Sequence, residues 1–497
     1  MAEKAKKMKL NYGKTLLIGF AFMASSIAWG VYDPYITTLL NKILGESALI
    51  AGWSAKLVEK FPVLLEFMQA QGEDVGSAAT GFTLVPLFIG IIMTFDNIFG
   101  VIFQPTFGKI SDRCHTRIGK RKPFILIGAP LAAVIFAIIP RVALHENGRI
   151  SAMMICIILF VFVMSFWRAP CVALMPDLTP PALRSEGNSV INLVGGVGSL
   201  LALQAATIVC AIGGWDKATQ EEEYIPYVFL FASIVMIICT LVVAFFVKEP
   251  DSRLKVQMQA NMENDAKAKR KAEKDAAKKE KERLKAIKLS KGERVSLICM
   301  LAGLFFLFCG ANAIQTFFAL FAAEILGKSS GEATSMLTIF AISTAIGAIP
   351  AGLLGRKFGR KKTIVAGLTM FIAAFVVYLV VDAMMGNALS LVYVALVVGG
   401  FANMLITVNT LPLVLEIGGL DKVGTFTGYY YTATFSAQIA TPIVYGIVRM
   451  LTGTYGSLFY YCPICFVLSL LCILFVRHGE SEEITEDIIK EARMADD

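Results

Sequence analysis

The amino-acid sequence predicts an all-α integral membrane protein with twelve transmembrane helices in two six-helix, pseudo-symmetric bundles. Composition is the first reason: 56% of the 497 residues are hydrophobic and only 17% are charged, with a mean hydropathy of +0.67. A soluble protein of this length keeps more charge for its surface. The second reason is that the apolar residues gather into runs of about 20, the length that a helix needs to cross a bilayer. In lipid no water is present to hydrogen-bond the backbone N–H and C=O groups. These groups must therefore pair within the segment, which favours helices.

Twelve such runs follow one another along the chain. They cover residues 14–40, 82–108, 123–144, 151–175, 187–213, 225–247, 295–324, 333–354, 363–384, 389–416, 424–450 and 455–476. Six precede and six follow a segment rich in Lys, Glu and Ala, which is typical of a solvated linker. The predicted parts are therefore an N-terminal six-helix bundle (1–247), a charged cytoplasmic linker (248–294), a C-terminal six-helix bundle (295–477) and an acidic cytoplasmic tail (478–497). The long loop 41–80 predicts an amphipathic helix or hairpin.

Basic residues predict the orientation. Lys and Arg crowd the N-terminus, the loops 112–122 and 356–362, and the segment 248–294. With twelve spans all four lie on one side, which the positive-inside rule makes cytoplasmic. We therefore expect a multi-pass protein of the cell (inner or plasma) membrane with both termini in the cytoplasm. The formal net charge of +8 reflects this topology, and nucleic-acid binding is the poorer explanation, so we expect no nucleic-acid partner.

Enzymatic chemistry has no recognisable signature in the chain. Most of the ten cysteines lie in apolar runs and indicate small buried side chains, not disulfides or metal ligands. The three histidines lack metal-ligand spacing. No nucleophile motif or phosphate loop is apparent. We expect neither an enzyme nor a bound metal or cofactor.

A motif of glycines and bases recurs at matching places in the two halves. After the second run come Gly108, Asp112, Arg113, Gly119, Lys120 and Arg121, and after the eighth run come Gly352, Gly359 and Arg360. An acid also ends the fourth run (Asp177) and the tenth (Glu416). Such duplication is typical of transporters with a substrate site near the midplane. We interpret the loops as a conformational latch that gates access; the simpler alternative is a topology signal alone.

These residues resemble the loop motif of the major facilitator superfamily. The stretch "QPTFGKISDRCHTRIGKRKPF" (104–124) is similar to that of the glycoside–pentoside–hexuronide:cation symporters, and closest to their sucrose–proton symporter branch. The stretches "RAPCVALMPDLTPPALRSEGN" (168–188) and "GTFTGYYYT" (424–432) resemble bacterial members of that branch. The resemblance implies the major facilitator fold and proton-coupled sugar transport.

Two departures from the family pattern bear on mechanism. Arg356 stands where the second half would repeat the motif acid Asp112, so that latch cannot form in the same way. Melibiose-type relatives carry two cation-binding carboxylates on the second helix, and alignment on Pro105 places Gly100 and Gln104 there. Sodium prefers several hard oxygen ligands, so the loss of both carboxylates disfavours a melibiose-type sodium site.

Three ionisable residues lie well inside predicted spans: Asp33, Asp96 and Arg168. Such a residue costs at least about 2.5–3.5 kcal/mol at the bilayer centre and usually faces a cavity or a partner. The resemblance places their helices around the central cavity. We expect Asp96 or Asp33 to carry the proton, because a carboxylate can be neutral or ionised there. Arg168 is expected to bind sugar oxygens. Permanent structural bonds are the alternative for each.

Sugar binding needs aromatic faces for C–H surfaces, with amides and hydroxyls for the sugar hydroxyls. Besides Arg168, the candidates in the first half are Trp29, Tyr32, Asn97, Gln104 and Trp167. The candidates in the second half are Asn312, Gln315, Asn409, Tyr429 and Gln438. Each alone is more often a helix-packing residue or an interfacial aromatic than a ligand contact, and only their concentration on the first, second, fourth, seventh, tenth and eleventh spans supports a cavity.

The leading hypothesis is a secondary active transporter that carries a disaccharide or related glycoside together with protons (symport), by alternating access. A proton-coupled antiporter or exporter of another small molecule on the same fold is the first alternative. A non-transporting membrane sensor or regulator is the second. The expected partners are a small-molecule substrate, protons and lipid, with the protein acting as a monomer.

Overall fold

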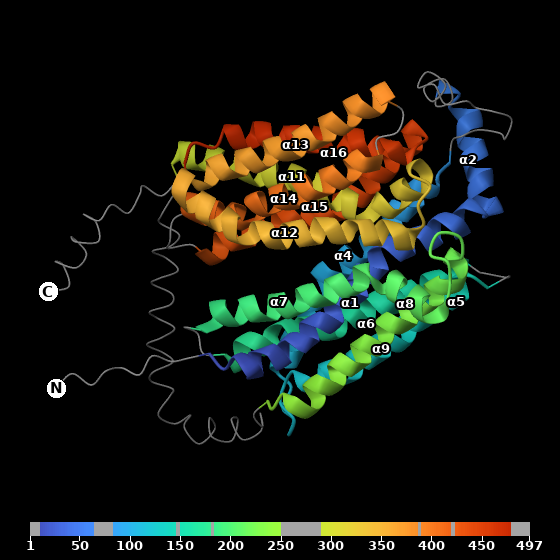
Figure 1. Cartoon of the computed structure of the whole chain (residues 1–497). Coiled ribbons are helices and arrows are strands. Elements are labelled where there is room, and N and C mark those ends of the chain that lie inside the picture. Colours follow the sequence, from blue (N-terminus) through green and yellow to red (C-terminus); the bar gives the residue numbers. More distant parts are fainter. Residues whose placement is uncertain are drawn as a thin grey trace, which may run out of the picture. The chain divides into compact units, whose positions relative to one another are not determined.

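The computed structural model describes residues 10–63, 83–145, 150–179, 183–249, 290–385, 389–418 and 423–478. Within these ranges the regular elements are all helices (Figure 1). They are α1 (Tyr12–Gly45), α2 (Ala48–Lys60), α4 (Val85–Asp112), α5 (Lys122–Ala143), α6 (Ile150–Leu178), α7 (Arg184–Leu203), α8 (Ala205–Gly213), α9 (Glu221–Phe246), α11 (Lys291–Ile325), α12 (Ser330–Phe358), α13 (Arg360–Met385), α14 (Leu389–Gly418), α15 (Val423–Thr452), the 3₁₀ turn η3 (Tyr455–Ser457) and α16 (Leu458–Leu474).

Ten helices of the described chain are long and apolar enough to cross a membrane, and up to eleven if α7 and α8 form one span. The protein is therefore a multi-pass membrane protein, as predicted. The fifth predicted run, 187–213, is not one straight helix, because α7 and α8 meet at a bend of 50°. Gln204 lies at this bend, where its side-chain amide donates to Thr338 Oγ1 at 2.6 Å. Helix α15 is not in the set, because it carries many Gly, Ser, Thr and Tyr residues.

The described residues divide into two compact units. The first comprises residues 1–269, 312–338 and 438–458, and the second comprises 270–311, 339–437 and 459–497. Helices α11, α12 and α15 each contribute one part to either unit. The predicted linker and tail lie almost wholly outside the described residues, at 250–289 and 479–497, so the predicted domain boundaries stay a prediction.

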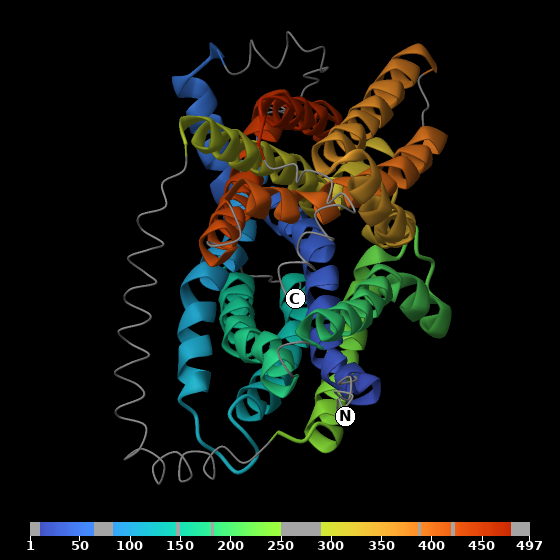
Figure 2. The same cartoon turned by 90° about the vertical axis from the view of Figure 1, so that its left-hand side faces the viewer.

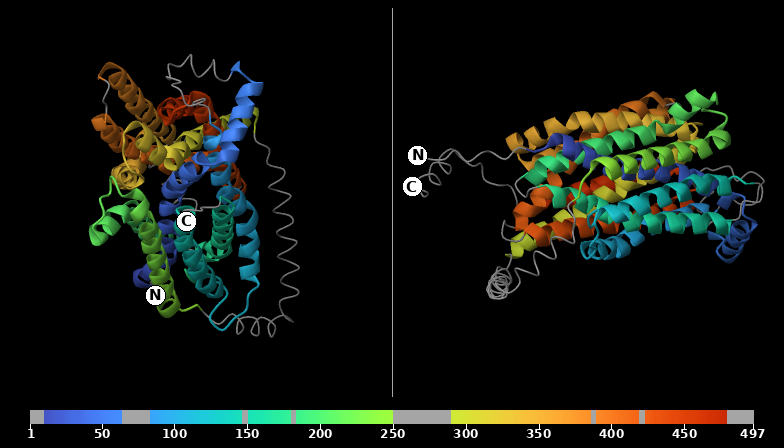
Figure 3. Two further views of the ribbon diagram at one scale, coloured as in Figure 1. Left: turned by 90° about the vertical axis from the view of Figure 1, so that its right-hand side faces the viewer. Right: turned by 90° about the horizontal axis from the view of Figure 1, so that it is seen from below.

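Helix α1 is the central element of the first unit. It contacts α4, α5, α6, α7 and α9, and Figure 2 shows these helices from the left-hand side of Figure 1. A helix that is apolar on all sides is normally surrounded by others, and Tyr32 and Tyr35 on α1 are fully buried. The predicted helix in the loop 41–80 is confirmed as α2, which follows α1 at the end shown in the left view of Figure 3.

Helices α4 and α15 cross at two glycines within the first unit. A methyl group on Gly90 would overlap the backbone carbonyl oxygen of Pro442. Reciprocally, a methyl group on Gly446 would lie 2.5 Å from the carbonyl oxygen of Pro86. The Thr94 hydroxyl adds a hydrogen bond of 3.2 Å to Ile439 O. Only glycine permits two helix backbones to come this close.

The second unit is held by similar small-residue and aromatic contacts. Helices α13 and α14 pack against each other, and Phe371 on α13 stacks on Phe466 of α16 with ring centroids 4.7 Å apart. Ser469 on α16 donates to the carbonyl oxygen of Gly303 on α11 at 2.8 Å. Interhelical hydrogen bonds of this kind contribute roughly 0.6–2 kcal/mol each in a membrane.

Candidate functional site: a polar cavity around α1

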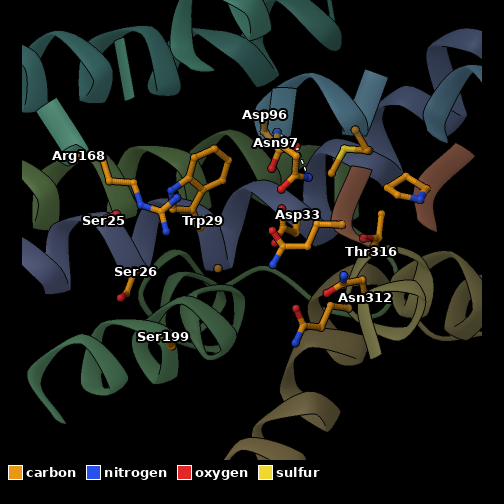
Figure 4. A pocket seen from close by; sticks show the side chains of 15 residues that line it. Ser25, Ser26, Trp29, Asp33, Asp96, Asn97, Arg168, Ser199, Asn312 and Thr316 are labelled. Atoms are coloured by element: carbon orange, nitrogen blue, oxygen red, sulfur yellow. Dashed lines mark hydrogen bonds between the residues drawn. The ribbon is translucent and has the colours of Figure 1, made fainter. Parts of the chain in front are cut away.

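A cavity of about 410 Å³ lies within the first unit, among α1, α4, α6 and α7 and the parts of α11 and α15 that belong to this unit (Figure 4). Its lining is mostly polar although the helices are apolar. The lining residues are Ser25, Ser26, Trp29, Gly30, Asp33, Met93, Asp96, Asn97, Arg168, Ser199, Asn312, Gln315, Thr316, Gln438 and Pro442.

Three charged side chains line this one cavity, and Figure 4 shows them together. The Arg168 guanidinium lies over the Trp29 ring, 5.6 Å from its centroid. Asp96 Oδ1 accepts from the backbone amide of Asn97 at 2.6 Å and from its side-chain amide at 2.8 Å. Among the described residues no ion pair within 4.0 Å joins Arg168 to either acid. The three charged groups thus face the same cavity, where binding of a ligand or of a proton can change the attraction between them.

Two prolines leave backbone carbonyl groups beside the cavity without their helical hydrogen-bond donors. Pro34 follows Asp33 inside α1 and has no amide hydrogen, so the carbonyl of Gly30 one turn earlier lacks its helical donor. Pro442 inside α15 does the same for the carbonyl of Gln438. Gly30 and Gln438 both line the cavity. A ligand hydroxyl group could satisfy such carbonyls.

Unpaired donors complement these acceptors. Trp29 Nε1 and Asn312 Nδ2 are buried and have no hydrogen-bond partner among the described residues. Asn312, Gln315 and Thr316 share one face of α11, since residues three and four apart in a helix are neighbours. Buried polar atoms without a partner cost free energy, so the cavity is prepared for a ligand with several hydrogen-bonding groups.

Eight of the predicted site residues come together here. They are Trp29, Asp33, Asp96, Asn97, Arg168, Asn312, Gln315 and Gln438. Tyr32 and Trp167 do not line the cavity but are fully buried behind it. Tyr32 stacks on Phe160 with centroids 5.5 Å apart, and the Trp167 side chain packs against Gly128. They support α1 and α6, the helices that carry Asp33 and Arg168.

Three other predicted site residues lie outside the cavity lining. Gln104 is on α4 more than two turns beyond Asp96, toward the basic loop. Asn409 belongs to the second unit, where its buried amide donates to the carbonyls of Ala351 and Leu405 at 3.1 and 2.9 Å. Tyr429 is also in the second unit and is 47% exposed.

Several lining residues were not predicted from the sequence. Ser25 and Ser26 lie one turn before Trp29 on α1, and Met93 lies one turn before Asp96 on α4. Helical spacing from the two acids could have found these three. Ser199 and Thr316 carry no such signal, because a lone hydroxyl in a span is usually bonded to its own helix.

The basic loop of the first half ties three helices together. The Arg121 side chain is only 6% exposed and donates to Asp177 Oδ2 at 2.8 Å. It also donates to Asp112 and to Gly108 O. Lys120 pairs with the same Asp177 at 3.1 Å. The loop thus links the ends of α4, α5 and α6.

The end of α9 joins the same cluster. Lys122 Nζ donates to the carbonyls of Ala244 and Val247, each at 2.8 Å. The Glu249 carboxylate accepts from the backbone amides at the start of α5, as an acid at a helix N-terminus commonly does. Gly119 provides the turn before α5 with φ of 107°.

The second half repeats this arrangement without the motif acid. Arg360 pairs with Glu416 at the end of α14, as Arg121 does with Asp177. Lys361 Nζ donates to the carbonyls of Leu474 and Val476 at the end of α16, as Lys122 does to those of Ala244 and Val247 at the end of α9. Arg356 is exposed and stands in place of the motif acid, so the second half keeps the arginine–acid pair without a counterpart of the Asp112 contact.

Not every motif residue has the expected geometry. Glycine at 108 could permit two helices to approach closely, but a methyl group there would make only an ordinary 3.9 Å contact with Ala169. Gly352 faces open space, and the tight helix contact in the second unit falls at Gly355 against Asn409. Gly359 has φ of 93° and matches Gly119. Arg113 is exposed beside the cluster.

Replacing Arg121 with Gln is expected to lower stability, because it leaves the Asp177 and Asp112 carboxylates with fewer donors. Hydrogen bonds to charged groups contribute about 1.5–3 kcal/mol, less where a partner is exposed. Thermal unfolding of the purified protein should show a lower Tm. Arg113→Gln is the matched control and should unfold as the parent does; equal shifts for the two variants would mean that Arg121 has no special role.

A bundle of membrane-spanning helices around a polar cavity lined by charged groups defines a membrane transport protein. The chain belongs to the MFS/sugar transport protein family, whose model matches residues 82–417. Members of this family are transporters and not enzymes. The resemblance to the major facilitator superfamily and its sucrose–glycoside symporter branch is confirmed.

Sequence relatives include sucrose transporters of plants. The chain is 27% identical over 190 residues to the sucrose transport protein SUC3 of Arabidopsis thaliana, covering 31% of this chain and 29% of that protein. It is 23% identical over 245 residues to the sucrose transport protein SUT4 of Oryza sativa subsp. indica, covering 43% and 38%. The matched segments therefore span well under half the length of these relatives.

Solved structures share the fold over nearly the whole chain. The D-xylose–proton symporter matches with a TM-score of 0.59 at 16% identity, covering 95% of this chain and 98% of that chain. A bacterial homologue of the human lysosomal transporter Spinster, in an inward-facing and occupied conformation, matches with a TM-score of 0.57 at 11% identity, covering 94% and 95%. The chain thus has the fold of major facilitator transporters.

Proposed function

We propose that this protein is a secondary active transporter that imports a disaccharide or related glycoside together with protons, by alternating access. The observation that carries the proposal is the cavity with Asp33, Asp96 and Arg168 in its lining. Its volume of about 410 Å³ falls in the range of small-molecule sites, roughly 300–1,000 Å³. The sucrose transporters among its relatives support a sugar as the substrate.

Each charged residue has a role in this proposal. Asp96 or Asp33 binds the proton, because a carboxylate in a low-dielectric site can exist in either form. Arg168 stays charged and donates its fork of N–H groups to sugar oxygens, since neutralising an acid frees the guanidinium from competing attraction. Trp29 offers an aromatic face, and Asn97, Asn312, Gln315 and Gln438 offer amides to the hydroxyl groups.

The wider architecture belongs to the same proposal. Helix α15 and the bent pair α7–α8 bring the number of spans to twelve, in two six-helix bundles. The protein lies in the cell membrane, and both termini lie in the cytoplasm. The clusters around Arg121 and Arg360 act as latches on the cytoplasmic side. The protein works as a monomer in contact with lipid, because the fold encloses its own path.

Uptake into proteoliposomes tests this function. Purified protein is reconstituted, a pH gradient (acid outside) is imposed, and accumulation of radiolabelled sugars from a panel of mono- and disaccharides is measured. Accumulation above the outside concentration, abolished by a protonophore and absent from protein-free liposomes, is the expected result. If no sugar in the panel accumulates, the sugar proposal fails. If sugar accumulates only when the pH gradient is inverted (acid inside), protons leaving the liposome drive sugar in, and the protein is an antiporter.

Arg168→Lys is expected to weaken substrate binding although it keeps the charge. The lysine ammonium lacks the planar fork that can hold two sugar oxygens and stack on Trp29. Loss of one charge-assisted bond, about 1.5–3 kcal/mol, corresponds to a roughly 10–100-fold higher Kd. Sugar-dependent thermal stabilisation measures this. Arg117→Lys, in the exposed loop, should bind as the parent does, and an unchanged Kd for Arg168→Lys would exclude direct recognition.

A further inference from the structure

A second cavity, of about 460 Å³, lies at the far end of α5 and α9, opposite the basic loop. Arg141, Trp215, Glu223, Pro226 and Tyr227 line it. All five belong to the first unit, and none takes part in the polar cavity around α1. The transport mechanism therefore leaves this cavity without a role.

An ordered aromatic pair forms one wall. Trp215 and Tyr227 stack with ring centroids 4.6 Å apart at 28°. The Trp215 ring also covers Gly213, where a methyl group would overlap it. Hydrogen bonds from the Asp216 amide to Gln220 Oε1 (2.7 Å) and from the Thr219 hydroxyl to Asp216 (2.7 Å) fix the turn that holds Trp215. The wall is thus preformed.

Opposite charges face this wall without neutralising each other. Arg141 donates from Nη1 to Ala137 O at 3.1 Å, which leaves its other N–H groups available. Glu223 accepts from the Gln220 side-chain amide through Oε2, at 3.0 Å. Within the described chain no ion pair within 4.0 Å joins Arg141 to Glu223. The cavity therefore offers one cationic and one anionic contact to the same ligand.

An apolar stripe on α5 leads to this cavity. Its large exposed side chains are Ile127, Leu131, Val134 and Ile138, at intervals of four, three and four residues, and Arg141 follows three residues later. This spacing keeps them on one face of the helix. Arg141 is therefore the polar end of a lipid-facing stripe.

Helix α9 repeats the pattern beside it. Tyr227, Ile234, Ile238, Leu241 and Phe245 are exposed at intervals of seven, four, three and four residues. Helices α5 and α9 pack along each other, as Figures 1 and 3 show. Two apolar stripes thus run side by side from the cavity along the membrane-spanning length. Such a surface suits acyl chains whose headgroup lies in the cavity.

We propose that this cavity binds a phospholipid whose headgroup carries both a phosphate and an ammonium group. The phosphate accepts from Arg141, for which a guanidinium fork is well suited. The ammonium pairs with Glu223 and lies against the Trp215–Tyr227 wall, whose faces attract cations. The acyl chains follow the stripes on α5 and α9. A free sugar would contact Arg141 and Glu223 but has no acyl chains to cover the apolar stripes on α5 and α9.

Native mass spectrometry of the purified full chain tests the proposal. The protein is equilibrated with equimolar phosphatidylethanolamine and phosphatidylglycerol of identical chains, and bound lipid is counted. The parent protein should retain mainly phosphatidylethanolamine. In Arg141→Gln and Glu223→Gln this retention should fall by about tenfold, the effect of one charge-assisted contact. In Glu223→Gln the preference over phosphatidylglycerol should also vanish, because the anionic lipid has no ammonium.

Controls separate this site from general detergent and lipid binding. Lys56→Gln and Glu59→Gln on α2 remove exposed charges outside the cavity and should retain lipid as the parent does. Trp215→Leu keeps an apolar side chain and removes the aromatic face, and should weaken retention while the Tm without lipid stays similar. Equal retention of both lipids by the parent, or unchanged retention in all three cavity variants, would overturn the proposal.

Discussion

Asp96→Asn is expected to abolish accumulation of sugar driven by a pH gradient. Asparagine keeps the size of the side chain and can still pair with Asn97, but it cannot release a proton. One pH unit supplies about 1.4 kcal/mol per proton, which permits roughly tenfold accumulation. The variant should therefore equilibrate sugar at a ratio of about one, while exchange of labelled for unlabelled sugar continues.

Asp33→Asn is the necessary comparison, because both acids line the same cavity with Arg168. If Asp96→Asn still concentrates sugar and Asp33→Asn does not, Asp33 carries the proton. If both variants concentrate sugar with the parent's pH dependence, neither acid couples and the mechanism is wrong. Asp216→Asn, in the exposed turn before α9, is the matched control and should transport as the parent does.

Gly90→Val is expected to slow transport through a steric effect at the crossing of α4 and α15. The new side chain would overlap the carbonyl oxygen of Pro442, which is backbone and cannot rotate away. Overpacking of this kind typically costs 1–3 kcal/mol, which lowers the equilibrium constant for forming this helix contact roughly 5–150-fold. A protein that must form and release this contact in each cycle would then turn over more slowly by a similar factor.

Initial uptake rates and Tm together measure this effect. Gly196→Val on α7 is the matched control, since a side chain there meets nothing within 4 Å. It should transport and unfold as the parent does. The expected result for Gly90→Val is slow transport by a folded protein. Uptake at the parent's rate would show that α4 and α15 need not approach this closely during transport.

Polar contacts within the first unit join the start of α12 to α9 and α1. Ser330 N–H at the start of α12 donates to Glu221 at 2.9 Å, and Gly331 N–H donates to Tyr224 Oη at 3.2 Å. Tyr35 and Thr334 hydroxyls lie 3.3 Å apart. None of these partners was predicted, because they are over 100 residues apart in the chain and no periodic pattern connects them.

Ten of the twelve predicted spans, or up to eleven, are long apolar helices in the described chain. They were predictable because the bilayer imposes one requirement, about 20 apolar residues with paired backbone groups. The break at Gln204 escaped prediction, since the residue that holds the bend, Thr338, lies on another helix. The acids at helix ends, Asp177 and Glu416, were recognised as part of the repeated motif, but their partners were not predicted. The structure pairs them with Arg121 and Arg360.

By itself the sequence determined the membrane class, the helical spans, the repeated loop motif and the three costly charges at Asp33, Asp96 and Arg168. These follow from local composition and from the high cost of charge in lipid. Only the tertiary structure decided which polar residues share the cavity. It brought in Ser199 and Thr316 and left Gln104, Asn409 and Tyr429 outside, because the face that a helix turns inward depends on the neighbours it packs against.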